Sequence, residues 1–397
     1  MDLVISSRPR AVRRRSELRV NAVRDELAAA VERTALGLID PDRIEALADD
    51  LHLIERRRVH HVGLVVAAVV LSAMQRSTDT QGRWLDAQVK YEELNGAESG
   101  KTSFRNQVIK MVPVMRELLR RRLAAFAEAT DHPELRGRLK AFADVLIPDG
   151  CAFKLASALS NVYAGTGQPA ELKLHAVYSV RAGGVVSVAK TAGSVHDSDG
   201  FWPEKWVCGA LYIWDLGYVS NERFIDAATA GSHVLQRLKS TQNPVVIASY
   251  GTTSHRRVLE HEGARVRLDA ACELGLLHRQ HVLDLDVEIT DDKRRTVVAR
   301  VVCLPFGGED RYYLTTLPRE IFTAHDIAEL YRIRWEVELF FRGWKGALRL
   351  DEVKRMRHPL ALEAAVTASL LAGTLTQEIT RTVNELERLA QAEAISP

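Results

Sequence analysis

The sequence predicts an α/β fold: a mixed sheet flanked by helices, with a β-rich insertion and a helical N-terminal domain. Three observations lead to this class. Residues 20–140 hold long amphipathic runs with few glycines, as helices do. From residue 141, short apolar runs end in turns, and further on such runs alternate with helix-like segments. At 397 residues, the chain is long enough for two or three domains with buried cores.

Composition and charge limit the class of protein. A hydrophobic share of 46% and a charged share of 27% are ordinary for a globular chain and argue against extensive disorder. The net charge of +2 does not by itself predict a nucleic-acid partner. The apolar stretch 62–73 is too short to span a bilayer. The cysteines lie far apart without metal-ligand spacing, which disfavours structural zinc and suits a reducing compartment. We therefore expect a cytoplasmic bacterial protein without a membrane span.

Residues 1–140 are predicted to form a helical N-terminal region that binds DNA. Six arginines and two acids fall in the first twenty residues, a basic patch that suits phosphate contacts as well as a solvated face. The segment 103–108 (SFRNQV), which follows a turn-like GKTS, has the composition of a recognition helix. A plain helical bundle is the alternative, and the sequence leaves both open.

Residues 141–239 are predicted to form the first part of the catalytic sheet domain. The run 141–149 (AFADVLIPD) and the run 210–215 (ALYIWD) are short apolar strands that each end in an acid. Two alternating segments around the turn 181–184 indicate a hairpin. Ser220 is a suitable N-cap for a helix over 221–230, and 233–239 (HVLQRLK) is the fifth strand.

The remaining chain divides into three predicted segments. Residues 240–325 form the β-rich insertion, because HVLDLDVEI, RTVVARVVCL and RYYLTTL follow one another with short turns. Residues 326–359 contain the helix that completes the sheet domain. Residues 360–397 form a C-terminal helical region.

Two carboxylates stand where α/β folds place their chemistry. Asp149 and Asp215 each follow an apolar strand and precede a glycine-containing turn. If the two strands are neighbours, their side chains converge, and carboxylate oxygens are the ligands that Mg²⁺ and Mn²⁺ prefer. Each acid also has a simpler interpretation as a turn residue. Asp197, next to His196, is a weaker candidate for the second acid because it follows no apolar strand.

The segment 331–345 (YRIRWEVELFFRGWK) is the most informative stretch of the chain. On a helix at about 100° per residue, Tyr331, Arg334, Glu338 and Lys345 fall within an arc of roughly 60°. Apolar residues fall on an adjoining arc that can pack on a sheet. This arrangement could hold a metal-bound phosphodiester, or it could be a solvated face with ion pairs between residues four apart.

Taken together, these residues resemble the DDE transposases of bacterial insertion sequences, in the branch with a Y-(2)-R-(3)-E-(6)-K signature. The four signature positions match at the expected spacing, and two strand-ending aspartates precede them. The resemblance covers roughly residues 141–375. Further residues that resemble the family are Lys173, His175, His196, Asp197, Arg237, Lys239, Trp335, Phe340, Phe341, Arg342 and Trp344.

The resemblance implies an RNase H-like fold in which Asp149, Asp215 and Glu338 bind two Mg²⁺ or Mn²⁺ ions. It implies cleavage of the element's ends and transfer of their 3′-hydroxyls to target DNA. The residues expected to contact DNA are Tyr331, Arg334, Arg342, Lys345, Arg237 and Lys239. The implied partners are double-stranded transposon-end and target DNA, bound by a homodimer on paired ends in the nucleoid.

Two departures from the family pattern affect these expectations. The segment 240–325 contains no tryptophan, although some relatives use one to stabilise a flipped base during hairpin formation, so a hairpin step is not expected unless His281, Tyr312 or Tyr313 stacks instead. Pro148 precedes the first aspartate, which suits a strand that ends there.

Two alternative functions stay open. One is a DNA-binding protein derived from a transposase without activity, and the other is an RNase H-like nuclease.

Overall fold

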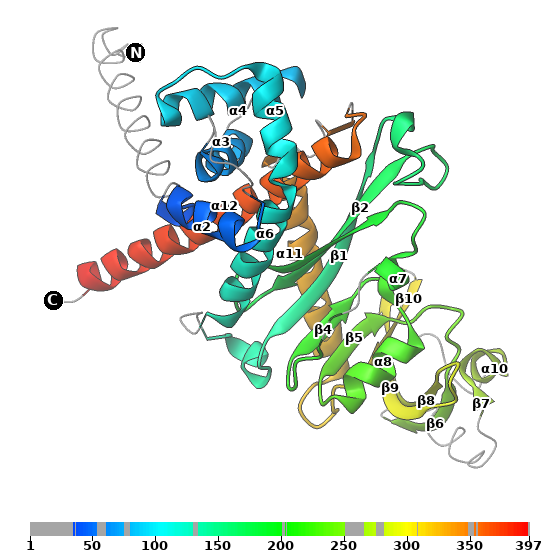
Figure 1. Ribbon diagram of the computed structural model, residues 1–397. Helices are drawn as coiled ribbons and strands as arrows, with labels where there is room; N and C mark the ends of the chain where they lie inside the picture. The colour runs from blue at the N-terminus through cyan, green and yellow to red at the C-terminus, as the bar shows by residue number, and fades with distance from the viewer. Residues whose placement is uncertain are drawn as a thin grey trace, which may run out of the picture. The chain divides into compact units, whose positions relative to one another are not determined.

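The computed structural model describes residues 35, 37–53, 61–74, 80–129, 134–200, 203, 205–250, 266–274, 282–307, 309–347, 353–354 and 356–395. The chain divides into two compact units. The helical unit takes residues 1–120, 347–353 and 360–397, and the sheet unit takes residues 121–346 and 354–359. Figure 1 shows the helices and strands of both.

The helical unit is built around one almost entirely buried helix. In α3, eleven of thirteen residues are buried, and Gly63 lies so close to the carbonyl of Pro41 that a Cβ there would overlap it. The guanidinium of Arg83 is buried as well, and it donates to the carbonyl of Ala365 at 2.7 Å and to the hydroxyl of Ser369. The described helices of this unit are α2 (Pro41–Asp50), α3 (Val62–Met74), α4 (Thr80–Asn95), α5 (Lys101–Lys110), the first part of α6 (Val112–Glu128) and most of α12 (Pro359–Ile395).

One described helix, within α12, is long and apolar enough to cross a membrane. It covers Pro359–Arg381, and 78% of its apolar window is buried inside the protein. The apolar stretch over α3 is shorter, and α3 is likewise a buried helix. Both segments therefore serve as core helices here, since a helix that is apolar all round can also be the centre of a packed domain.

The sheet unit contains one sheet, in which ten strands are described, in the order β3-β2-β1-β4-β5-β10-β9-β8-β6-β7. Its first five strands follow the order 3-2-1-4-5, with β1, β4 and β5 parallel and β2 antiparallel to β1. This arrangement is RNase H-like and confirms the predicted fold class. The strands are β1 (Val145–Lys154), β2 (Glu171–Ser179), β3 (Gly184–Ala192), β4 (Leu211–Trp214), β5 (His233–Arg237), β6 (Val245–Tyr250), β7 (Val266–Arg267), β8 (Leu283–Thr290), β9 (Thr296–Phe306) and β10 (Glu309–Thr315).

The β-rich segment continues the sheet. β10 pairs with β5 in antiparallel register, Tyr313 opposite Arg237, and β9, β8, β6 and β7 follow outward. One hydrophobic cluster runs through both parts and includes Val234 and Leu285. Residues 251–265 and 275–281 lie outside the described residues, and the predicted stacking candidate His281 is among them.

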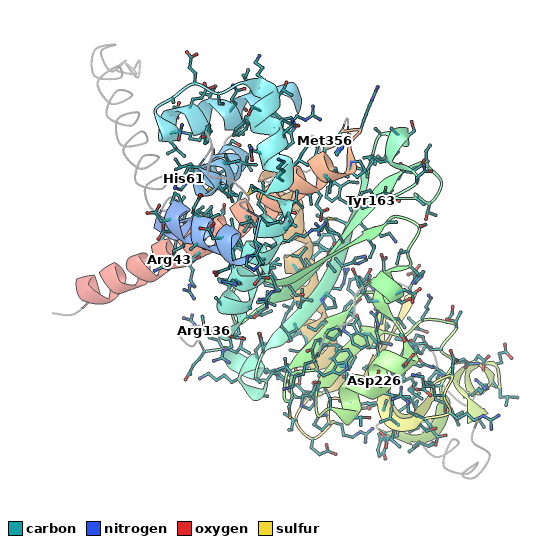
Figure 2. The ribbon with its side chains drawn as sticks, viewed as in Figure 1. Arg43, His61, Arg136, Tyr163, Asp226 and Met356 are labelled. Atoms are coloured by element: carbon teal, nitrogen blue, oxygen red, sulfur yellow. The ribbon has the colours of Figure 1, made fainter. Side chains whose placement is uncertain are left out.

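Helices cover the sheet, and two of them matter for the site. α8 (Asn221–Thr229) begins at the predicted N-cap, where the Ser220 hydroxyl accepts from the N–H of Arg223 at 3.4 Å. Asp226 of α8, labelled in Figure 2, accepts from Arg295 at 2.6 Å, which ties the helix to the β8–β9 turn. In the view of Figure 1, α8 lies in front of the sheet and α11 (Ala324–Ala347) behind it. Two shorter helices are α7 (Asp197–Gly200) and α10 (Leu268–Glu273).

The prediction that the first strand ends at Asp149 is wrong, as is its interpretation as a turn residue. β1 continues to Lys154, and Asp149 is paired with Ala176 of β2. β2 pairs with β1 along its length as far as Lys154, so the strand continues beyond Pro148 and Gly150. The register with β4 covers only the first two residues of β1, so further along the strand is paired on one side, where a proline is tolerated.

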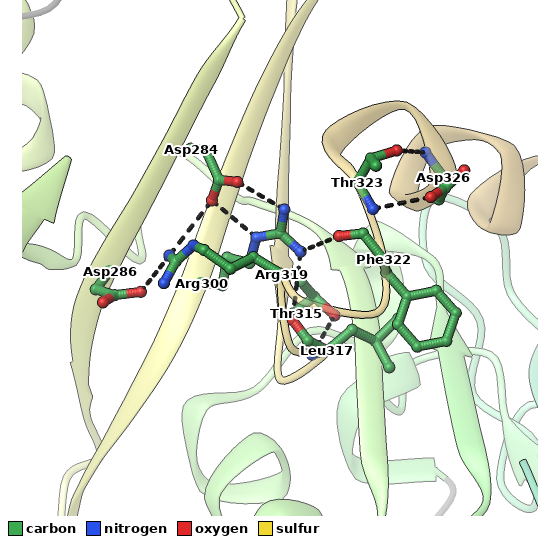
Figure 3. A network of polar contacts seen from close by, with 9 residues as sticks. All are labelled: Asp284, Asp286, Arg300, Thr315, Leu317, Arg319, Phe322, Thr323 and Asp326. Carbon is green, nitrogen blue, oxygen red and sulfur yellow. Dashed lines mark hydrogen bonds and ion pairs between the residues drawn. The ribbon is translucent and has the colours of Figure 1, made fainter. Parts of the chain in front are cut away.

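A network of aspartates and arginines fixes the approach to α11 (Figure 3). Arg300 is 5% exposed; it donates to both oxygens of Asp284 at 2.8 and 2.7 Å and to the carbonyl of Phe322 at 2.7 Å. Arg319 donates to Asp286 at 2.5 Å and lies over the ring of Tyr250. We call Asp284, Asp286, Arg300 and Arg319 the paired cluster. It ties β8 and β9 to the loop that leads into α11.

The start of α11 is also capped. The Asp326 carboxylate accepts from the N–H of Thr323 at 2.8 Å, and the Thr323 hydroxyl accepts from the N–H of Asp326 at 3.3 Å. This reciprocal pattern is a capping box. Arg138 forms an ion pair with the same carboxylate. The direction of α11 is therefore fixed at its first turn, several turns before the residues of the predicted site.

Candidate active site

The first two predicted acids come from neighbouring strands. β1 and β4 are paired in parallel, which meets the condition for the two acids to converge. Asp215 directly follows β4 and precedes a short 3-10 turn over Leu216–Tyr218. Asp149 and Asp215 are close enough for the charge of one to raise the pKa of the other.

The third acid reaches the same place from α11. The Arg334 guanidinium donates to Glu338 one turn further on, with Nη1 2.6 Å from Oε1, and the same Nη1 lies 3.7 Å from Oδ1 of Asp215. The side chain of Arg334 is only 16% exposed. We call Asp149, Asp215, Glu338 and Arg334 the carboxylate cluster. The ion pair expected from an ordinary solvated helix face is present, but it is half-buried and includes an acid from the sheet.

Asp149 is the most perturbed acid of the carboxylate cluster. Burial raises its pKa to about 6, while the N–H of Gly150 and the charge of Arg334 act in the opposite direction and the charges of Asp215 and Glu338 add to the rise. The Gly150 N–H donates to Asp149 Oδ1 at 2.8 Å. Among the described side chains of the cluster, three carboxylates face one guanidinium, and an excess of negative charge suits a site that binds cations.

The turn after Asp215 is held by a buried pair beneath the first strand. The Tyr218 hydroxyl and Nδ1 of His175 are hydrogen-bonded at 2.9 Å, and Nε2 of His175 is hydrogen-bonded to Thr191 at 2.9 Å. A Cβ at Gly150 would lie 2.6 Å from the Tyr218 hydroxyl. Burial lowers the pKa of His175 and raises that of Tyr218. Gly150 therefore lets Tyr218 fasten the Asp215 turn directly against the strand that carries Asp149.

The weaker candidate for the second acid has a different partner. Asp197 forms an ion pair with Lys173 at 3.0 Å, and Lys173 also donates to the carbonyl of Val195 at 2.8 Å. Asp197 Oδ2 is 2.9 Å from the position of a Cβ at Gly217. Asp197 therefore lies close under the turn that follows Asp215.

Tyr331, predicted to contact phosphate, is 9% exposed. Its ring lies 5.2 Å from that of Tyr313, and its hydroxyl has no hydrogen-bond partner among the described residues. Burial raises its pKa to about 12, while the charges of Arg334 and Arg237 act to lower it. The neutral hydroxyl is therefore a spare donor beside the carboxylate cluster.

The other predicted DNA contacts are placed differently. Arg237 ends β5 near Tyr331. Lys239 lies beyond the end of β5, which corrects its prediction as a strand residue, because β5 stops where its pairing with β10 stops at Arg237. It lines a cavity of about 940 Å³ with Tyr312 and Cys272. The side chains of Arg342 and Lys345 lie outside the described part of α11.

Sequence reasoning did not assign a role to Tyr218 or Gly150. The available signal was the pattern Asp-Leu-Gly-Tyr after an apolar strand, together with a glycine directly after Asp149. A glycine inside a strand indicates close approach by another group. Here that group is the hydroxyl of Tyr218.

The carboxylate cluster has the all-oxygen donor set that hard divalent ions prefer. Within the described ranges, no three Asp, Glu, His or Cys side chains are arranged to hold one ion together. Between Asp215 and Glu338 the cation is the guanidinium of Arg334. The donor chemistry therefore fits divalent ions, and an ion held by Glu338 has to compete with Arg334.

Comparison with solved structures finds a piggyBac transposase in a synaptic complex with hairpin DNA, with a TM-score of 0.43 and 9% identity over 90% of this chain and 76% of that chain.

Among known sequences, a transposase of insertion sequence element IS421 from Escherichia coli is 33% identical over 91 residues, 23% of this chain and 24% of the relative. The transposase of IS231E from Bacillus thuringiensis subsp. finitimus is 22% identical over 268 residues, 58% of this chain and 55% of the relative. The chain thus matches between a quarter and about half of the length of these two relatives. The family model described as transposase DDE domain matches residues 141–375, which is more than half of the chain. The protein belongs to the transposase DDE domain family.

Proposed function

We propose that this protein is a DNA transposase that cleaves the ends of an insertion sequence and joins their 3′-hydroxyls to target DNA. The observation that carries the proposal is the convergence of Asp149, Asp215 and Glu338, from two strands and a helix, around one arginine. A half-buried cluster with three acids and one base is costly for stability unless it binds cations.

We assign Asp149, Asp215 and Glu338 as ligands of two Mg²⁺ or Mn²⁺ ions. Ions held there would activate the attacking water or hydroxyl and stabilise the leaving oxygen. The protein's own contribution is to hold the acids in place. β1 and β4 fix Asp149 and Asp215 on one sheet, Tyr218 fastens the second turn, and the capped start of α11 directs Glu338.

Arg334 has two tasks in this proposal. It neutralises Asp215 and Glu338, and its planar guanidinium suits a phosphate of the DNA strand once an ion has taken its place beside Glu338. The hydroxyl of Tyr331, which has no partner in the part of the chain that the structure describes, adds a donor on the same helix. We place further DNA contacts at Arg237, Lys239, Arg342 and Lys345 on the strength of their positive charge and their position in the family signature.

The domain roles belong to the same proposal. Residues 1–140 would bind the ends, 141–239 and 326–359 would carry the chemistry, 240–325 would be an insertion into the catalytic domain, and 360–397 would close the chain as helix. A homodimer would hold two ends, in the cytoplasm on nucleoid DNA.

The test uses DNA duplexes that carry the inverted repeats flanking the gene. With Mg²⁺ or Mn²⁺ the protein should nick these ends and join them to a target plasmid, and chelation should abolish both reactions. Activity that survives the triple change Asp149→Ala, Asp215→Ala and Glu338→Ala contradicts the assignment. Cleavage of RNA–DNA hybrids without strand transfer would favour the nuclease alternative, and salt-dependent binding without cleavage would favour the inactive one.

A further inference from the structure

We propose that α5 is the helix with which this protein reads the base sequence of its DNA. The surface consists of Lys101, Thr102, Arg105, Asn106 and Lys110, all exposed, and the partner is the major groove of double-stranded DNA. The inference rests on the proposed function, because it assigns recognition of the element's ends to one helix of the helical unit. It does not depend on the carboxylate cluster.

The first support is the backbone arrangement of α4 and α5. α4 ends at Asn95, Gly96 follows in the left-handed region with φ 70°, and α5 begins at Lys101. Two helices joined by a short glycine-containing turn form a helix-turn-helix, whose second helix enters the major groove. Figure 1 shows α5 turning away from the line of α4. The predicted GKTS turn is wrong in one detail, because its last three residues already belong to α5.

The turn between these helices is rigid. Glu92 of α4 accepts from both the N–H and the hydroxyl of Ser99, at 2.9 and 3.2 Å. Gln88 donates to Glu92 at 2.9 Å and to the carbonyl of Ser99 at 2.6 Å. Two residues of the first helix thus hold the last part of the turn, and the direction of α5 is fixed before any DNA is bound.

The two faces of α5 are sharply different. Phe104 and Val108 are 1% and 0% exposed, and the Phe104 ring lies 5.4 Å from that of Tyr91. Buried α3 also packs against α5. The five proposed reading residues are exposed, so the helix is anchored in the core by its buried residues and presents polar side chains at the surface.

Charge identifies the partner of this stripe. α5 has three cations and no acid. The side chains of Lys101, Arg105 and Lys110 form no ion pair with any residue in the described ranges. On the next helix the pattern is opposite, since Arg116 pairs with Glu363 and Arg120 with Glu117. Unpaired cations along one helix face complement the phosphates that line a groove.

The residues between the lysines have the chemistry to read bases. Arginine pairs with guanine and asparagine with adenine through two hydrogen bonds each in the major groove, whereas lysines at the ends of such a helix contact phosphates. We therefore assign base contacts to Arg105 and Asn106 and phosphate contacts to Lys101 and Lys110. Thr102 can add a contact to either.

The experiment selects bound duplexes from a random 30-base-pair library, a length of about three helical turns, using the full chain with a chelator present. Affinity is then measured on the selected duplex and on a scrambled duplex at several salt concentrations. Arg105→Lys keeps the charge but loses the planar guanidinium that can make two hydrogen bonds to one base. The preference for the selected duplex should therefore fall about tenfold or more. Asn106→Ala should act in the same way. Lys101→Gln and Lys110→Gln should weaken both duplexes alike and each reduce the salt slope by about one.

The matched control is Arg43→Gln on α2, an 88% exposed arginine of the same unit (Figure 2). It should change neither preference nor salt slope. Unchanged preference in Arg105→Lys and Asn106→Ala, with thermal melting as for the unsubstituted protein, overturns the inference, and so does an equal effect of Arg43→Gln. The binding experiment contains a chelator, so it does not depend on cleavage. A negative cleavage test would therefore not affect the binding result, and a negative binding result would not affect the cleavage test.

Discussion

Two clusters of acids and arginines, both formed by described residues of the sheet unit, differ in charge balance. In the paired cluster, Asp284 and Asp286 face Arg300 and Arg319, and each carboxylate has an arginine within 2.7 Å (Figure 3). In the carboxylate cluster three acids share Arg334. Among the described side chains, the first cluster has as many arginines as acids, whereas the second has two more acids than arginines.

This difference separates a structural role from a proposed chemical one. A buried ion pair that is fully hydrogen-bonded fixes the local geometry and needs no further counterion. Removing one partner leaves the other as an unpaired buried charge. Burial raises the pKa of Asp149, and the charges of the two neighbouring carboxylates add to the rise; an excess of carboxylates also attracts cations. The two clusters also cooperate, because the paired cluster ties down the loop before the helix that carries Glu338.

The largest expected effect is the loss of chemistry when the carboxylate cluster loses one ligand. Glu338→Gln should reduce end cleavage about 10⁴-fold, since a metal ligand supports transition-state charge worth several kcal/mol. The melting temperature should stay within a few degrees. Asp286→Asn in the paired cluster is the matched control, and its cleavage rate per folded molecule should remain within about threefold. Equal losses in both variants would erase the distinction between the clusters.

The second effect concerns stability, for which the paired cluster should matter more than the carboxylate cluster. Arg300→Met should lower the free energy of unfolding by about 3 kcal/mol, because it leaves Asp284 buried without its bidentate partner. Arg334→Met should cost less than about 1 kcal/mol, since the carboxylates it leaves are partly exposed. Urea denaturation of both variants measures the difference. A larger loss for Arg334→Met would mean that the carboxylate cluster is the structural one.

A third prediction uses the raised pKa of Asp149. Its pKa is about 6 in the folded protein against about 3.9 in an unfolded chain, so folding favours the protonated form. The stability cost of ionising Asp149 is absent below pH 4, grows as the pH rises through 6, and is complete above it. Asp149→Asn should therefore raise the free energy of unfolding by about 3 kcal/mol at pH 8, without divalent ions, and hardly change it at pH 4.

Chemical denaturation at the two pH values tests this, with Asp286→Asn as control because Asp286 is already neutralised by Arg319. Added Mg²⁺ should stabilise the unsubstituted protein at pH 8 but not Asp149→Asn, since the ion needs the ionised carboxylate. Stabilisation of Asp149→Asn at pH 4 as large as at pH 8 would show that its effect is packing and not charge.

Sequence reasoning went furthest where local chemistry repeats. The hairpin around 181–184 and the N-cap at Ser220 were predictable, because alternation, capping and turn residues act over a few positions. The adjacency of β1 and β4 was only a condition of the site hypothesis, because it depends on the fold. The end of β1 was not predictable. A proline and a glycine indicate a break, but a long antiparallel partner outweighs them. Strand length here is decided by β2, which begins seventeen residues after β1 ends.

For the site, the sequence predicts which acids take part, but not how many of them face the same arginine. That Arg334 faces Glu338 four residues on was implicit in helix spacing, whereas its approach to Asp215, 119 positions earlier in the chain, depends on the fold. The burial of Tyr331 against Tyr313 could not be predicted for the same reason. Sequence alone does not show which strand covers a helix face.

The smallest predicted effect tests whether Arg334 acts as the resident cation. Its guanidinium lies 2.6 Å from Glu338 and 3.7 Å from Asp215, so a divalent ion has to displace it and also overcome its charge. Arg334→Gln should therefore bind Mn²⁺ about tenfold more tightly, a gain of roughly 1.4 kcal/mol, while losing cleavage. The electron paramagnetic resonance signal of free Mn²⁺ measures this affinity without any DNA. Arg332→Gln removes the same charge from an exposed position two residues away, where solvent screens it, and should leave the affinity unchanged. If both variants bind more tightly, the effect is general charge; if Arg334→Gln binds more weakly, Arg334 holds the carboxylates in place for the ion instead of competing with it.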